Sequence, residues 1–139
     1  LEWADLAINN PFFGQSNFTT LSAKGNVLMA MGKADEAKAI YKSAIDLPDA
    51  GVFQVHQLGR IMIGQGEHDL ALEIFEKNME KHPNTWPVDF GMARAYSAKG
   101  EYKKALKHAK IAVERAPNEP NKNVLLGFIE QLKKGEDIN

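Results

Sequence analysis

The chain has 139 residues, of which 44% are hydrophobic and 25% are charged, which suits one compact domain with a core. A formal net charge of -1 excludes a global field for DNA, RNA or anionic membranes, and no apolar run approaches the ~20 residues of a spanning helix. There is no cysteine, the four histidines are scattered, and no HExxH, G-x-S-x-G or phosphate-loop motif occurs, so we expect no metal, no cofactor and no catalysis.

The first predicted element is a helix over residues 1–11. Small and apolar side chains recur there at helical spacing, and Pro11 closes the helix. The chain begins at Leu1, inside this helix, rather than at a methionine. We therefore expect a domain cut from a longer protein, whose targeting signal would lie outside this sequence, so the compartment stays unknown.

The next elements follow a repeat of constant length. Gly32, Gly66 and Gly100 stand 34 residues apart, and each is followed five residues later by an alanine. A fixed interval of this size indicates one supersecondary unit copied along the chain. Apolar residues recur at helical spacing on both sides of each glycine, and a proline region closes each unit, so every unit predicts a helical hairpin. The three repeats are residues 18–51, 52–85 and 86–119.

Helix starts are also encoded in the sequence. Thr85 and Asn118 are expected N-caps, with Pro87 and Pro120 in the first turns that follow them. A terminal helix is predicted over residues 120–135. Its apolar stripe needs cover, either by capping the array or by pairing with a second copy or another domain. The candidate oligomer contacts in a homodimer are Leu125, Phe128 and Leu132.

These residues resemble the tetratricopeptide repeat family. In the second repeat, residues 52–85, the resemblance is carried by Leu58, Gly59, Gly66, Ala71, Phe75 and Pro83. In the third repeat, residues 86–119, it is carried by Trp86, Ala93, Tyr96, Gly100, Tyr102, Ala105, Ala112 and Pro117. It implies an all-α fold, a right-handed superhelical array of antiparallel helical hairpins. Residues 1–139 would then form a single domain, with residues 1–11 as the second helix of a preceding repeat, three full repeats and the terminal helix 120–135.

By the same resemblance, the array is a non-catalytic module that binds protein or peptide in a concave groove. The groove is lined by the first helix of each hairpin. Arg60 and Arg94 occupy the same position in adjacent repeats, and their guanidinium groups could bind an acidic group. The phenylalanines could act as apolar anchors. The expected ligand is therefore an extended peptide with acidic and apolar residues. The predicted groove residues are Asn26, Phe53, His56, Gln57, Arg60, Phe90, Arg94 and Phe128.

Two alternatives stay open at this point. The arginines would instead pair with groove-edge carboxylates such as Asp89, while the phenylalanines close the hairpin packing. The second alternative concerns the whole chain, which would be an architectural appendage that docks within its own chain or dimer. In this it loosely resembles repeat tails of exported bacterial proteins. Lys24, Asn78 and Asp89 depart from the family pattern. They indicate either locally frayed packing or polar networks, unless their side chains simply reach solvent or a backbone cap.

Overall fold

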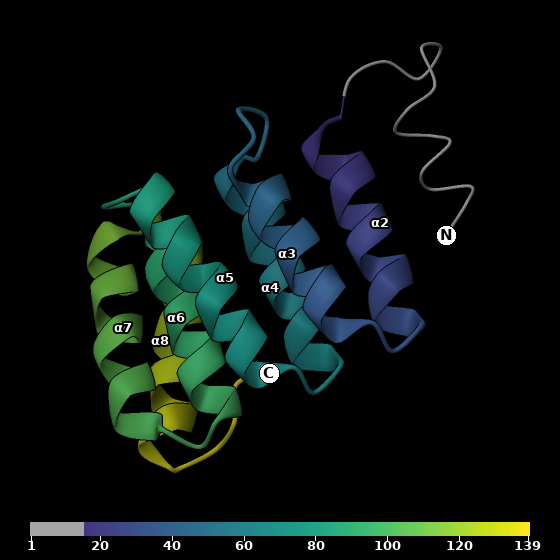
Figure 1. Ribbon diagram of the computed structural model, residues 1–139. Helices are drawn as coiled ribbons and strands as arrows, with labels where there is room; N and C mark the ends of the chain where they lie inside the picture. Colours follow the sequence, from purple (N-terminus) through teal and green to yellow (C-terminus); the bar gives the residue numbers. More distant parts are fainter. Residues whose placement is uncertain (1–15) are drawn as a thin grey trace. The chain divides into compact units, whose positions relative to one another are not determined.

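The computed structural model describes residues 16–139, so the helix expected over residues 1–11 lies outside the described residues. Residues 16–139 form seven α-helices and no strand (Figure 1). The predicted all-α class of helical hairpins is therefore confirmed. The helices are α2 (Phe18–Ala30), α3 (Ala34–Ile45), α4 (Val52–Gly64), α5 (His68–Lys81), α6 (Trp86–Ala98), α7 (Tyr102–Arg115) and α8 (Glu119–Lys133).

The repeated glycines end the first helix of each hairpin. Gly32, Gly66 and Gly100 have φ values of 76°, 79° and 76°, in the left-handed region that glycine adopts without steric strain. In the middle turn the Gly66 N–H donates to the Ile63 carbonyl at 3.0 Å, and the next N–H donates to the Met62 carbonyl at 2.9 Å. This pattern satisfies the last carbonyls of the helix and reverses the chain. Gly135, with φ 73°, makes the same turn after α8.

The described chain divides into two compact units, of which the first covers residues 16–51. Here α2 packs against α3, and Gly25 faces the fully buried Tyr41. A Cβ at Gly25 would lie 2.4 Å from the Tyr41 ring, so only glycine allows this approach of the two helices. Asn17 and Thr20 cap the start of α2 through reciprocal hydrogen bonds of 2.9 and 3.1 Å.

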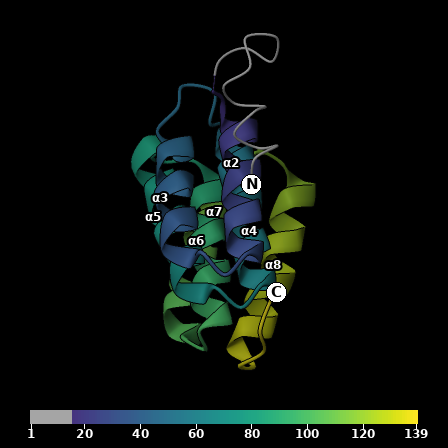
Figure 2. The ribbon, with the colours of Figure 1, turned by 45° about the vertical axis from the view of Figure 1, so that its right-hand side comes forward.

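The second unit, residues 52–139, contains the remaining helices. In it α4 packs against α5 and α6, α6 packs against α7, and α7 packs against α8 (Figure 1, Figure 2). Phe75 of α5 is fully buried, and a Cβ at Gly59 or at Gly91 would lie 2.4 Å from its ring. One aromatic side chain therefore occupies the space that two glycines leave open. A single domain over residues 1–139 stays a prediction.

The apolar stripe of α8 is covered within this unit. Leu125, Ile129 and Leu132 are buried in a cluster that also contains alanines of α6 and α7. The exposed apolar side chains of α8 are Val124 and Leu126, at 57% and 47%. An oligomer contact through Leu125 or Leu132 would therefore require α8 to leave this cluster.

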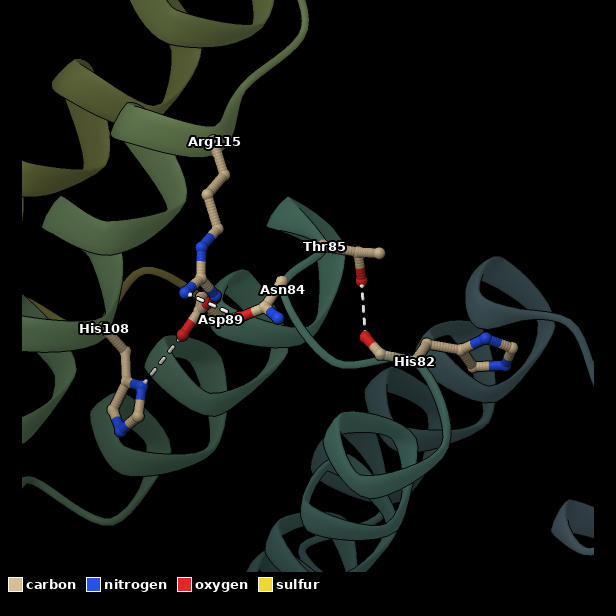
Figure 3. Close-up of polar contacts among 6 residues, drawn as sticks. All are labelled: His82, Asn84, Thr85, Asp89, His108 and Arg115. Carbon is tan, nitrogen blue, oxygen red and sulfur yellow. Dashed lines mark hydrogen bonds and ion pairs between the residues drawn. The ribbon is translucent and has the colours of Figure 1, made fainter.

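The two expected N-caps behave differently. The Asn118 side chain accepts a hydrogen bond from the Asn121 N–H at 3.0 Å and caps α8 as predicted. Thr85 occupies the N-cap position of α6 but makes no capping bond with its side chain. Its hydroxyl donates to the His82 carbonyl at 2.9 Å instead, which links α6 to the end of α5 (Figure 3).

Candidate functional site

Four aromatic side chains from the first helices of the second unit form a continuous series, which we call the aromatic row. Phe53 of α4 meets Trp86 of α6 edge to face at 6.1 Å between ring centroids. Trp86 stacks on Phe90 at 6.4 Å, and Phe90 lies 5.3 Å from Phe128 of α8. Three helices that are remote in sequence therefore contribute to one aromatic surface, which is 61% exposed at Phe53 and 8% exposed at Phe90.

His56 lies beside this row, between two phenylalanines. Its ring stacks on Phe90 with centroids 5.8 Å apart and tilts against Phe75 at 5.4 Å. Burial, followed by the positive charge of Arg94, lowers the pKa of His56 to about 4. The imidazole is therefore neutral at pH 7. Because the Pro87 carbonyl lies 3.1 Å from Nδ1 and only accepts, the neutral ring donates through its Nδ1 proton.

Arg94 places a guanidinium group against the aromatic row. Its Cζ lies 4.4 Å from the centroid of Phe90 and 5.6 Å from that of Phe128. Such cation–π contacts favour the charged form, whereas burial, followed by repulsion from Arg60, lowers the pKa of Arg94 to about 10. The guanidinium still carries its charge at pH 7. Its buried Nε has no hydrogen-bond partner among the described residues.

Arg60 adds a second cation from α4. It is exposed, and its guanidinium donates to the Gln57 side-chain oxygen at 3.5 Å. Burial is the main cause of the lowered pKa of Arg94, and repulsion from Arg60 adds to it, as expected for two like charges on neighbouring helices. With His56 neutral, these two arginines carry the positive charge beside the aromatic row, and the carboxylate of Asp137 acts on Arg94 from the end of the chain described.

The structure places seven of the eight predicted groove residues in this second unit. The eighth, Asn26, belongs to the first unit, where its side-chain oxygen accepts a hydrogen bond from the Tyr41 hydroxyl at 2.6 Å. Asn26 therefore helps to join α2 and α3. The role of all eight residues in binding stays a prediction. The seven of the second unit are Phe53, His56, Gln57, Arg60, Phe90, Arg94 and Phe128.

Asp89, one of the departures from the family pattern, pairs outside the aromatic row. Its carboxylate is 5% exposed, accepts from Arg115 at 2.5 Å, and lies 3.4 Å from Nδ1 of His108 (Figure 3). Arg115 also donates to the Asn84 side chain at 3.2 Å. Asp89 therefore neutralises Arg115 on α7 rather than Arg60 or Arg94, and it forms a buried polar network.

Asn78, a second departure, binds the backbone of a neighbouring helix with its side chain. It is fully buried, and its side-chain nitrogen donates to the Val52 carbonyl at 3.0 Å. Its side-chain oxygen has no partner among the described residues. The asparagine thereby ties α5 to the first residue of α4.

We expect Asp89→Ala to destabilise the second unit by about 1–3 kcal/mol, because Arg115 and His108 lose a buried acceptor. Both partners retain some access to water, with side chains 37% and 20% exposed, which limits the loss. Urea unfolding followed by circular dichroism would measure it. Glu114→Ala, at an exposed position of α7, is the matched control and should change the stability by less than about 0.5 kcal/mol. Equal losses in the two variants would contradict the role of the Asp89 network.

Sequence reasoning missed two parts of this site. Trp86 was explained by the repeat pattern alone, yet it connects Phe53 to Phe90. Residues 136–139, which we call the return segment, follow the last turn and approach α6: the Ile138 N–H donates to Ser97 Oγ at 3.0 Å. The one available signal was an isolated isoleucine in a polar stretch.

Comparison with known proteins supports the repeat architecture. Two family models, both described as Tetratricopeptide repeat, match residues 19–50 and residues 62–121, together about two thirds of the chain. A search of curated proteins gave no match. Between residues 16 and 139, no helix is long and apolar enough to cross a membrane. No metal-binding group of three or more His, Asp or Glu side chains was found in that part of the chain.

Proposed function

Because the chain belongs to the tetratricopeptide repeat family, whose repeats generally mediate protein–protein interaction, we propose that its second unit binds an extended segment of another protein. The observation that carries this proposal is the aromatic row with two arginines beside it. Aromatic and arginine side chains are the residue types that contribute most binding energy at protein interfaces.

The electrostatics of the surface define the partner more closely. Arg60 has no carboxylate partner among the described residues, Arg94 is stacked on aromatic rings, and His56 is neutral. A segment that carries acidic residues would form charge-assisted hydrogen bonds with the guanidinium groups. Apolar side chains of the same segment would pack on the exposed face of Phe53. An acidic and apolar peptide therefore complements this surface in both charge and hydrophobicity.

The double variant Arg60→Ala, Arg94→Ala tests this proposal. Loss of the charge-assisted bonds should weaken capture of the partner in a pull-down at least about tenfold. The matched control is Lys107→Ala, Lys110→Ala, which removes two positive charges from exposed positions on α7. The control should retain the partner at the level of the wild-type chain. A partner retained equally by all three proteins would refute the assignment of this surface.

A further inference from the structure

The return segment, residues 136–139, lies on the surface proposed to bind a partner. Gly135 reverses the chain after α8, with the Glu136 N–H donating to the Gln131 carbonyl at 3.0 Å, and the segment then runs back beside α6 (Figure 1). It has no regular secondary structure. Its contacts with α6 are therefore made by individual residues of an extended chain.

Ser97 of α6 binds both a side chain and the backbone of this segment. Its hydroxyl, in a residue only 1% exposed, donates to the Asp137 carboxylate at 2.7 Å and accepts the Ile138 N–H at 3.0 Å. Burial disfavours ionisation of Asp137, but hydrogen bonds from Ser97 and Asn139 outweigh it and lower the pKa of this carboxyl. Asp137 is therefore bound as a carboxylate at neutral pH.

Arg94 binds the next part of the segment. The Asn139 side-chain nitrogen donates to the Arg94 carbonyl at 2.9 Å, and the Arg94 guanidinium donates to the Asn139 oxygen at 3.4 Å. Burial and repulsion from Arg60 lower the pKa of Arg94, and the negative charge of Asp137 partly offsets this lowering. The return segment thus engages the same arginine that the proposed function assigns to a partner.

Ile138 supplies the apolar anchor. Its side chain is 6% exposed and belongs to the cluster that contains Phe90 and Leu132, whereas Asp137 and Asn139 on either side are exposed. An extended segment held by one buried aliphatic side chain and a few hydrogen bonds has low local stability and opens readily. Such a segment can be displaced without unfolding the helices beneath it.

From these contacts we propose that residues 137–139 are an internal ligand, which a partner displaces with an acidic residue followed directly by a branched aliphatic residue. This inference rests on the proposed function and specifies its partner chemistry. The segment is tethered to α8 by a short turn, which gives it an effective concentration in the millimolar range. A partner must therefore bind tightly enough to displace the tethered segment. Release of the segment raises the apparent affinity of the surface for the partner.

The test uses a fluorescein-labelled peptide with the sequence Gly-Glu-Asp-Ile-Asn, a copy of residues 135–139. Its affinity is measured by fluorescence polarisation for the full chain and for Ile138→Asp, which removes the anchor. The variant should bind the peptide about tenfold more tightly than wild type, because the surface is no longer occupied. A peptide with the order Gly-Glu-Ile-Asp-Asn should bind neither protein, because its acidic and aliphatic residues are exchanged.

Two further variants keep the result interpretable if Ile138→Asp disturbs folding. Asp137→Ala removes the carboxylate bound by Ser97, and Glu136→Ala removes the neighbouring carboxylate, which is exposed. We expect peptide affinity to rise with Asp137→Ala and to stay at the wild-type value with Glu136→Ala. Equal affinities for all the proteins would overturn the internal ligand. That result would leave the proposed function standing, because partner capture through Arg60 and Arg94 is measured separately.

Discussion

Phe75→Ala should lower the free energy of unfolding of the second unit by about 3–5 kcal/mol, the range for loss of a fully buried aromatic side chain. The loss should lie at the upper end of this range, because the ring packs against two glycines. Neither Gly59 nor Gly91 has a side chain that can fill the space left by the ring. Urea unfolding followed by circular dichroism would measure the change.

Phe53→Ala is the matched control for Phe75→Ala. It removes the same atoms from a side chain that is 61% exposed, so the loss should stay below about 1 kcal/mol. In the opposite direction, Gly59→Ala places a methyl group against the Phe75 ring and should destabilise by about 1–3 kcal/mol. If Phe53→Ala and Phe75→Ala destabilised the chain equally, Phe75 would not be the central side chain of this packing.

The second large expected effect is a loss of stability on acidification, because the pKa of the buried His56 is lowered. The folded pKa of about 4 lies below the ordinary value of 6.5, so between these pH values the unfolded chain binds a proton that the folded chain does not. Stability contributed by the neutral ring is fully present above pH 6.5 and falls as the pH decreases towards 4. The difference corresponds to about 3 kcal/mol at the low end of the window. Unfolding measured at several pH values between these limits would detect it.

His56→Leu should flatten this pH dependence, because leucine does not titrate. His82→Gln removes a different histidine, one near the end of α5, and should leave the pH dependence of the wild-type chain in place. The electrostatic cause is also testable: Arg94→Ala removes a charge that lowers the pKa of His56 and should make the loss smaller. A profile unchanged by His56→Leu would show that another group causes the acid sensitivity.

The hairpin architecture was predictable because it depends on local conformation. Gly32, Gly66 and Gly100 each adopt a left-handed φ, a requirement of the turn itself that is visible in a single sequence. Asn118 likewise caps α8 through a residue three positions away. Thr85 shows the limit of such rules, since its hydroxyl bonds back to His82 rather than forward into α6.

The candidate site was predictable in part. Their positions within the repeats identified Phe90, Arg94 and Phe128, which the structure brings together in cation–π contact. The position of Asp89 within its repeat did not indicate which cation would neutralise its carboxylate. Its partner Arg115 lies 26 residues further along the chain, on another helix, and the pairing depends on how α6 and α7 pack. Long side chains reach partners that helical periodicity does not identify.

By itself, the sequence determined the repeat length, the helices, the turns between them and the side chains that face a common surface. These properties follow from backbone preference and helical periodicity, which act over a few residues. Only the tertiary structure decided that two glycines enclose Phe75, that His56 is buried neutral, and that residues 137–139 bind Ser97 and Arg94. Those outcomes depend on packing and desolvation between segments remote in sequence, which no local pattern encodes.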